Sequence, residues 1–177
     1  MHSFSYYFLI YAMKIYTSYF YNIRFFKPHQ IPLSTAVWDP KWFHEFKGQD
    51  HVWKDGNGVW NGLRIEILNP DNCCSLPPEC VECQRTRDPE TCSFIKDYFD
   101  GLQNKVDFQE LMEIMTRTAD YIQHLEGFQE EPEIMLIVHE APTCPCSERV
   151  PLHKYFRENG IELQEWDRHQ NLIDESK

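Results

Sequence analysis

The chain has 177 residues, of which 42% are hydrophobic and 15% aromatic, a composition typical of a folded globular protein and too apolar for a disordered one. The chain has 17 Lys and Arg against 28 Asp and Glu, which gives a formal net charge of -11. Because this charge repels the phosphate backbone of a nucleic acid, we expect no non-specific nucleic-acid binding. The same charge still allows a local basic site or a basic protein partner.

The first twelve residues, 1–12, are predicted to be an extension that precedes the folded part. Their apolar run is far shorter than the roughly 20 residues that cross a bilayer, and it lacks the basic leading region of an export signal, so we expect no membrane association. A strand pattern begins directly after Met13, which makes Met13 an alternative start to Met1; an extra edge strand is the other interpretation. Residues 13–166 are expected to form a single domain, and the polar residues 167–177 a flexible tail.

Two strands are predicted early in this domain, at Lys14–Phe20 and Ile31–Val37, because both runs are rich in β-branched and apolar residues. Polar side chains near the ends of these runs are candidate ligand contacts: Thr17, Ser18, Ser34 and Thr35. Trp38 and Trp42 come next, and they either pack in the core or offer a stacking surface for a base. Leu63–Leu68 alternates weakly and is compatible with a short strand or a helical turn.

A cysteine-rich insert is predicted at residues 69–92, which hold five of the seven cysteines. This clustering, together with the lack of an export signal, favours a reducing compartment, and we expect the cytoplasm. The Cys-x2-Cys spacing of Cys80 and Cys83 suits two sulfurs on one metal ion, and two further thiolates would complete a tetrahedral site. The predicted ligands are Cys74 (or its neighbour Cys73), Cys80, Cys83 and Cys92. Zinc is favoured over an iron–sulfur cluster, which thiolates could also hold, and unligated cysteines are the alternative.

The segment Asp107–Leu125 has the clearest helical pattern in the chain. Its apolar residues recur at helical spacing, Asp107 can cap the helix start, and Glu110 stands at the capping-box spacing. Gly127 is placed to end the helix. The apolar stripe predicts a helix that packs on the core.

The last predicted unit spans Ile134–Trp166 and consists of a strand, a polar loop, a short helix and a second strand. Ile134–Val138 is an unbroken apolar run, typical of a parallel strand covered on both faces, and Ile161–Trp166 alternates as a half-exposed strand does. The chain is therefore predicted to be an α/β protein, Rossmann-like, with a mostly parallel sheet flanked by helices. In such sheets ligands bind beyond the carboxyl ends of the strands.

The loop before the short helix holds the strongest site candidates. Ser147 can cap that helix, whose free N-H groups favour an anion, whereas Arg149 in its first turn opposes the helix dipole. Two readings remove this penalty: a phosphate or carboxylate ligand, or an internal ion pair of Arg149 with Glu140 or Glu148. Cys146 is a candidate nucleophile because the helix start favours its thiolate; a redox partner of Cys144 and a small buried residue are the alternatives. Glu140 is the candidate acid or base, and His139 is close enough in sequence to act with it.

Two stretches, Lys14–Phe43 and Ile134–Trp166, resemble the start and end of a known family. The first contains KIYTSYF, IPLS and PKWF, and the second contains Glu140-Ala141-Pro142 followed by Cys146-Ser147-Glu148-Arg149. The chain is similar here to an uncharacterised family of small bacterial and phage proteins, a domain of unknown function to which the YeaO-like proteins are distantly related. That family has a Cys-His-Arg signature; here a serine replaces the histidine and the arginine comes one position later. The resemblance implies a Rossmann-like sandwich and adds weight to the cysteine and the arginine, but it implies no activity.

Two functional hypotheses follow from these observations. The first is a small enzyme or sensor that binds a phosphate-bearing small molecule, foremost a nucleotide, at the carboxyl ends of the strands. The second is a non-catalytic, metal-stapled module that binds a protein partner, such as a host factor bound by a phage protein.

Overall fold

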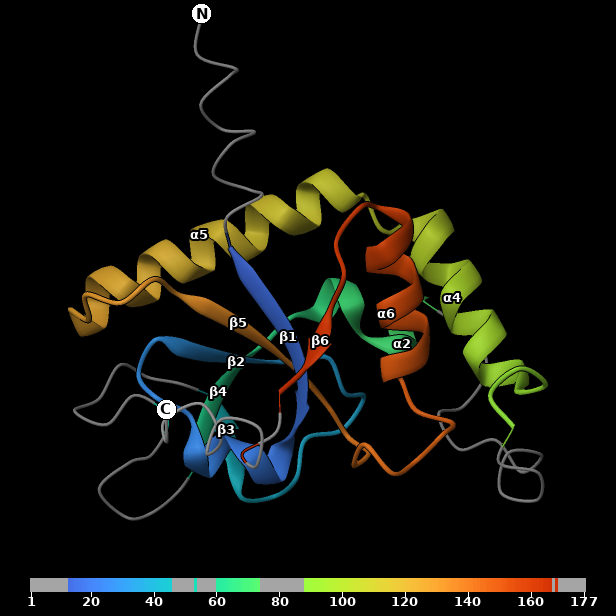
Figure 1. Ribbon diagram of the computed structural model, residues 1–177, viewed down its shortest axis with the longest axis horizontal. Coiled ribbons are helices and arrows are strands. Elements are labelled where there is room, and N and C mark those ends of the chain that lie inside the picture. The colour runs from blue at the N-terminus through green and yellow to red at the C-terminus, as the bar shows by residue number, and fades with distance from the viewer. Residues whose placement is uncertain (1–12, 46–52, 54–59, 74–87, 167, 169–177) are drawn as a thin grey trace, which may run out of the picture.

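The computed structural model describes residues 13–45, 53, 60–73, 88–166 and 168, and the structural statements below concern these residues. They form an α/β fold of the Rossmann-like kind, with six parallel strands in the order β3-β4-β2-β5-β1-β6 (Figure 1). The strands are β1 (Lys14–Tyr19), β2 (Gln30–Ser34), β3 (Phe43–Glu45), β4 (Trp60–Arg64), β5 (Glu133–Val138) and β6 (Gln164–Glu165). The α-helices are α2 (Pro70–Cys73), α4 (Ser93–Lys105), α5 (Phe108–Glu126) and α6 (Arg149–Glu158), and the 3-10 helices are η1 (Phe20–Phe25) and η2 (Glu66–Leu68).

Strand β5 is the centre of the sheet, although it is the fifth strand in the chain. It lies between β1 and β2 and pairs in parallel with both, with Leu136 opposite Thr17 on one side and Leu33 on the other. Its residues Ile134–Val138 are completely buried. The predicted strand is thus confirmed, and its lack of polar alternation has a physical cause, because side chains cover both faces of the sheet.

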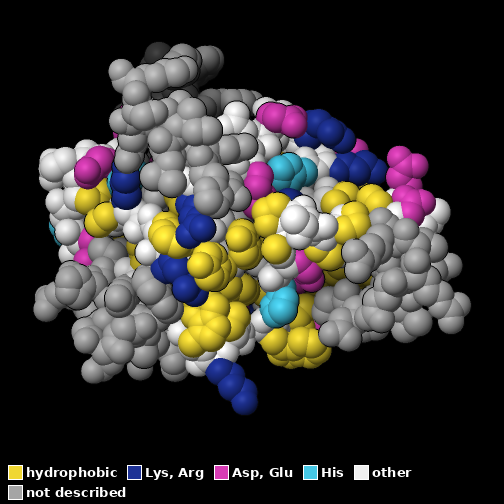
Figure 2. All heavy atoms as spheres, turned by 60° about the horizontal axis from the view of Figure 1, so that its bottom comes forward, with side chains coloured by type: hydrophobic (Ala, Val, Ile, Leu, Met, Phe, Trp, Pro, Cys, Tyr) yellow, Lys and Arg dark blue, Asp and Glu magenta, His cyan; other side chains and the backbone are white. Residues whose placement is uncertain are grey.

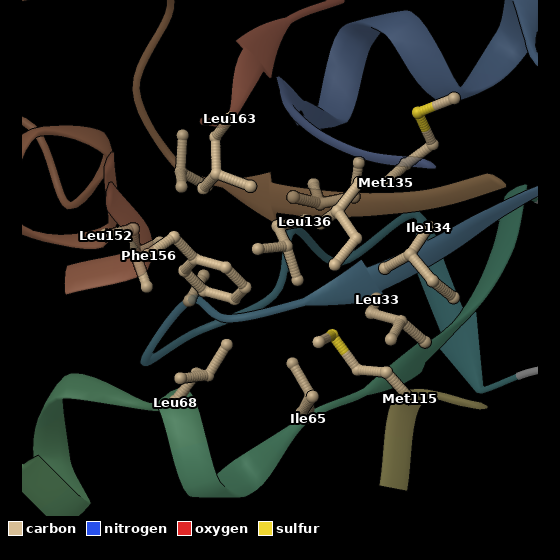
Figure 3. Close-up of a cluster of buried hydrophobic side chains, with 14 of the residues drawn as sticks. Leu33, Ile65, Leu68, Met115, Ile134, Met135, Leu136, Leu152, Phe156 and Leu163 are labelled. Atoms are coloured by element: carbon tan, nitrogen blue, oxygen red, sulfur yellow. The ribbon is translucent and has the colours of Figure 1, made fainter. Parts of the chain in front are cut away.

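Helices cover one face of the sheet, and η1 with its neighbours covers the other. Figure 3 shows Met115 of α5 and Phe156 of α6 close to Ile134 and Leu136, while Met135 points to the opposite side of β5. The buried residues of both faces belong to one hydrophobic cluster. On the η1 side that cluster includes Phe20, Ile23, Phe43 and Trp166.

Helix α5 forms as its sequence pattern predicts. The side chain of Asp107 accepts a hydrogen bond from the backbone N-H of Glu110 (2.9 Å), which satisfies one of the free donors at the helix start. Gly127 ends the helix in the left-handed conformation, with φ of 69°. The face formed by Leu111, Met112, Met115, Ala119 and Ile122 is buried.

Other elements differ from the sequence prediction. Helix α4 was not expected, although Phe94, Ile95, Tyr98, Phe99 and Leu102 recur at helical spacing and are buried. The segment Leu63–Leu68 contains both elements that its pattern allowed, the end of β4 and then η2. The last strand is shorter than Ile161–Trp166, because only Gln164–Glu165 pair with β1. The predicted extension, the tail beyond Arg168 and most of the cysteine-rich insert lie outside the described residues.

No helix in the described part of the chain combines the length and the apolar character that crossing a bilayer requires.

Candidate functional site

The carboxyl ends of β1, β2, β5 and β6 meet at one edge of the sheet, because all strands are parallel. We call this the carboxyl edge. At its centre, Arg149 donates from Nε to Oε2 of Glu165 at 2.6 Å, and the two side chains are only 11% and 23% exposed. An ion pair this short and sheltered is worth more than a surface pair, because little water competes for either charge.

Thr17 and His153 extend this ion pair into a network. Oγ1 of Thr17 donates to the same Glu165 oxygen at 2.6 Å and lies 2.7 Å from Nε2 of His153. A hydroxyl has one proton to donate, so the imidazole must donate in turn and carries its proton on Nε2. Burial, and then the charge of Arg149, lower the pKa of His153, which favours this neutral form.

Arg149 also fixes the loop that precedes α6. It donates from Nη1 to Oγ of Ser147 (3.2 Å) and from Nη2 to the backbone oxygen of Glu140 (3.0 Å). Oγ of Ser147 accepts the backbone N-H of Arg149 (3.2 Å), the first residue of α6, but the residue at the N-cap position is Glu148, whose side chain makes no capping hydrogen bond. With three of its five N-H groups engaged among the described residues, the guanidinium has two left for a further acceptor.

Two glutamates lie beside Arg149 in a protected setting. Glu148, the residue before α6, is 2% exposed, and its Oε2 lies 3.4 Å from Oγ1 of Thr35. Burial, and then the charge of Glu140, raise the pKa of Glu148 well above its usual value, which favours the neutral carboxylic acid. Oε2 of Glu140 is buried and has no hydrogen-bond partner among the described residues.

The other candidate contacts divide into internal and exposed residues. Ser18 is buried and donates to the backbone oxygen of Trp166, and Ser34 donates to Asp39, so both hydroxyls serve the fold. Trp38 and Trp42 are exposed, by 69% and 39%. Neither tryptophan belongs to the hydrophobic core, and their role as a stacking surface for a base stays a prediction.

Cys146, the candidate nucleophile, is half-buried and packs against the hydrophobic core. Its backbone oxygen accepts a long hydrogen bond from Sγ of Cys144 (3.5 Å). The imidazole of His139 lies edge-on to Phe20, with ring centroids 6.3 Å apart, on the side of the sheet that η1 covers. None of these contacts tests a covalent role of Cys146, which stays a prediction.

An internal ion pair of Arg149 with Glu140 or Glu148 is one of the two interpretations that the sequence allows; the structure has an internal pair, but with a different carboxylate. The carboxylate is that of Glu165, while Glu140 supplies only its backbone oxygen. Glu165 and His153 were both missed. Two signals could have found them: Glu165 ends a parallel strand and so lies at the carboxyl edge, and His153 stands four residues after Arg149, on the same helix face.

Of the predicted metal ligands, the structure describes Cys73, the alternative to Cys74, which is buried and whose Sγ donates to the backbone oxygen of Ile67 (3.4 Å), and Cys92, which is disulfide-bonded. In that state its sulfur is not a thiolate and does not serve as a zinc ligand. Cys74, Cys80 and Cys83 lie outside the described residues, so zinc or an iron–sulfur cluster in the insert stays a prediction. Within the described ranges no group of three or more His, Cys, Asp or Glu side chains is placed to hold a metal ion.

Comparison of the chain with protein-family models, with curated proteins and with solved structures gives no match. The resemblance to the bacterial and phage family therefore stays an expectation.

Proposed function

We propose that the protein binds a small phosphate-bearing molecule, foremost a nucleotide, at the carboxyl edge of its sheet, with Glu140 and Arg149 as the main contacts. The observation that carries the proposal is the buried Oε2 of Glu140, which has no hydrogen-bond partner in the described part of the chain. A buried carboxylate oxygen without a donor costs free energy, and a ligand N-H or O-H group would remove that cost. The position at the carboxyl ends of parallel strands supports the same reading.

The chemistry of the two main contacts limits the ligand. Glu140 accepts hydrogen bonds, whereas the two remaining N-H groups of Arg149 donate them, and both groups lie at the same loop because Arg149 contacts the Glu140 backbone. A suitable ligand therefore presents a donor and an oxygen acceptor together. A nucleotide does this, because exocyclic amino groups of its base donate and its phosphate oxygens accept.

The charges at the site predict that nucleotides bind with higher affinity than inorganic phosphate. Glu148 and His153 are favoured in their neutral forms, and the charge of Arg149 is already paired with the carboxylate of Glu165. This balance does not attract a free dianion. Orthophosphate alone should thus bind weakly, and most of the affinity of a nucleotide should come from its donors.

Thermal-shift measurements with orthophosphate, nucleosides and nucleoside monophosphates test the proposal. The wild type should be stabilised by at least one nucleotide and much less by orthophosphate at the same concentration. Glu140→Gln exchanges a charged acceptor for a neutral one and should weaken binding about tenfold. Glu131→Gln makes the same chemical change at an exposed residue outside the site and should have no effect.

Arg149→Lys is the second diagnostic variant. Lysine keeps the positive charge beside Glu165 but loses the fork that reaches Ser147 and the Glu140 backbone. Nucleotide affinity should fall about tenfold while the protein stays folded.

Absence of stabilisation of the wild type by every compound in the panel would reject the proposal. If the bound nucleotide is turned over, Glu140 is the candidate acid or base, and product analysis by chromatography would detect the reaction.

A further inference from the structure

The imidazole of His153 has one ring nitrogen engaged and the other open. Nε2 donates to Oγ1 of Thr17 at 2.7 Å, because Thr17 gives its own proton to Glu165. Nδ1 has no hydrogen-bond partner among the residues that the structure describes. In this tautomer Nδ1 carries the lone pair of the neutral ring, so it is the nitrogen that can take a proton or attack an electrophile. The ring is half-buried, and the fold does not use its reactive nitrogen.

His153 belongs to the same network as the proposed nucleotide site. Contacts of 2.6, 2.6 and 2.7 Å join Arg149 to Glu165, Glu165 to Thr17, and Thr17 to His153. Helix α6 begins at the carboxyl edge, and helical side chains point toward the helix start, so His153 in the second turn extends toward that edge. Figure 2 shows the molecule from this side, where His side chains reach the surface next to side chains of both charges.

Two arginines lie one helical turn to either side of this imidazole. Arg149 and Arg157 stand four residues before and after His153 on α6, so the three side chains share one face of the helix. Arg149 is paired with Glu165, whereas Arg157 is exposed and forms no ion pair within the described part of the chain. Because helical side chains lean toward the helix start, Arg157 extends over the turn that carries His153. Its guanidinium is therefore available to an anion beside the ring.

These surroundings suit a nucleophile better than a base. Burial lowers the pKa of His153 from its usual 6.5, the charges of Arg149 and Arg157 lower it further, and the exposed Glu162 opposes them. The ring is thus neutral at pH 7 and binds a proton weakly. The same two cations stabilise a dianionic group attached to the ring. A phosphoryl group is such a group, with close to two negative charges and three acceptor oxygens.

We propose that Nδ1 of His153 accepts a phosphoryl group, with a nucleoside triphosphate as the donor. The lone pair of Nδ1 forms a bond to the γ-phosphorus, the bond from that phosphorus to the bridging oxygen breaks, and its electron pair leaves with the nucleoside diphosphate. The ring becomes positively charged with its proton still on Nε2, and the carboxylate of Glu165 stabilises this charge through Thr17. The inference rests on the proposed function, because the nucleotide at the carboxyl edge is the donor.

Incubation of the protein with the magnesium salts of ATP and GTP, radiolabelled at the γ-phosphate, tests the inference. Wild type should take up label that survives base and is lost in acid, as a phosphorus–nitrogen bond requires. Phosphorus NMR of the base-denatured protein should place the group on Nδ1, because Thr17 occupies Nε2. His153→Gln keeps an N-H donor for Thr17 but has no nucleophilic nitrogen, and it should take up no label. His124→Gln is the matched control, since His124 is exposed on α5, and it should be labelled as wild type is.

Arg157→Gln tests the cation beside the ring. It removes a charge that no described ion pair uses, so the labelling rate should fall about tenfold while the melting temperature stays that of wild type. Arg117→Gln makes the same change on an exposed face of α5 and should leave the labelling rate unchanged. Equal labelling rates in Arg157→Gln and wild type would contradict the role of this arginine.

Phosphoramidate, which transfers a phosphoryl group without a nucleoside, separates this inference from the proposed nucleotide site. If a triphosphate raises the melting temperature of wild type but neither donor labels His153, the inference is wrong and the nucleotide site stands. If phosphoramidate modifies Nδ1 of His153 and no nucleotide stabilises the protein, the phosphoryl acceptor is supported and the nucleotide site is rejected. Label on Nε2, or undiminished label in His153→Gln, would overturn the inference. Release of orthophosphate from the nucleotide without labelled protein would also overturn it, in favour of His153 as a base.

Discussion

Arg149 and Glu165 are joined across the carboxyl edge by a short, sheltered ion pair, with 2.6 Å between Nε and Oε2. This pair explains why a cation is tolerated in the first turn of α6, where the helix dipole opposes it. The sequence predicts an anion next to this arginine, and the protein supplies one itself from β6. A ligand at this edge therefore meets an arginine that is already positioned by Glu165, Ser147 and the Glu140 backbone.

Removal of Arg149 should lower the free energy of unfolding more than removal of a surface arginine does. Arg149→Ala leaves Glu165 part-buried without its cation, and we expect a loss of about 2–4 kcal/mol in the free energy of unfolding. Arg117→Ala is the matched control, because Arg117 pairs with Glu113 at 3.5 Å on an exposed helix face and should cost less than about 0.5 kcal/mol. Urea denaturation measures both values. Equal costs would show that the Arg149–Glu165 pair is not sheltered in solution.

The pH dependence of stability should report the buried Glu148. Its pKa is raised in the folded state, so the folded protein holds this proton more tightly than the unfolded chain does. The stability from this group is full below the usual value of 4.5 and is lost as the pH rises through the folded pKa. Glu148→Gln mimics the neutral acid and should become more stable relative to wild type as the pH rises, by up to about 1.4 kcal/mol per pH unit in that window.

Unfolding curves of wild type, Glu148→Gln and the exposed control Glu131→Gln between pH 4 and pH 8 would measure this difference. A constant difference between Glu148→Gln and wild type over that range would show that the carboxyl group of Glu148 is not perturbed.

The contact between α4 and α2 should be intolerant of a single methyl group. A Cβ at Gly101 would stand 1.7 Å from the backbone oxygen of Cys73. Helix propensity alone favours alanine by about 1 kcal/mol, but the clash with backbone should outweigh it and give a net loss of about 1–3 kcal/mol for Gly101→Ala. At Gly127 the added Cβ meets nothing within 4 Å, so Gly127→Ala should cost only about 1 kcal/mol, through its φ of 69°. A stabilised Gly101→Ala protein would contradict the packing of α4 on α2.

The state of Cys92 separates a disulfide from a metal site in the cysteine-rich insert. Because a disulfide uses two sulfurs, at most five of the seven cysteines should react with a thiol reagent in the unreduced, denatured protein. A reductant should then lower the melting temperature while a chelator leaves it unchanged. Seven reactive thiols, with zinc near one equivalent by elemental analysis, would instead support the predicted zinc site.

The sequence was most informative where local pattern and tertiary environment agree. Two predicted elements are present: the strand formed by the apolar run Ile134–Val138 and the capped helix that begins after Asp107. A strand buried on both faces requires consecutive apolar residues, and a capped helix requires particular residues at its ends, so both can be recognised in the sequence. Helix α4 was missed although its apolar spacing is regular. Its first apolar residue, Phe94, comes only two positions after Cys92, at the end of a proline- and cysteine-rich segment with little periodicity of its own.

The site was less predictable because its central contact joins residues sixteen positions apart on different elements. Arg149 stood out from its place at the helix start, but its partner depends on where β6 lies in the sheet, which local pattern does not determine. Ser18 and Ser34 are candidate ligand contacts in the sequence that turn out to serve the fold. Both are polar residues near strand ends, and both are used by internal hydrogen bonds that only the folded chain reveals.

The most direct test of the proposed ligand site is a titration of the ¹⁵N-labelled protein with a nucleoside monophosphate, followed by amide chemical shifts. We predict that the shifts change mainly at the carboxyl edge, at residues 17–19, 139–149 and 164–166, and that Glu140→Gln reduces these changes at equal ligand concentration. Changes confined to other parts of the chain, or none at saturating ligand, would contradict a nucleotide site at this edge.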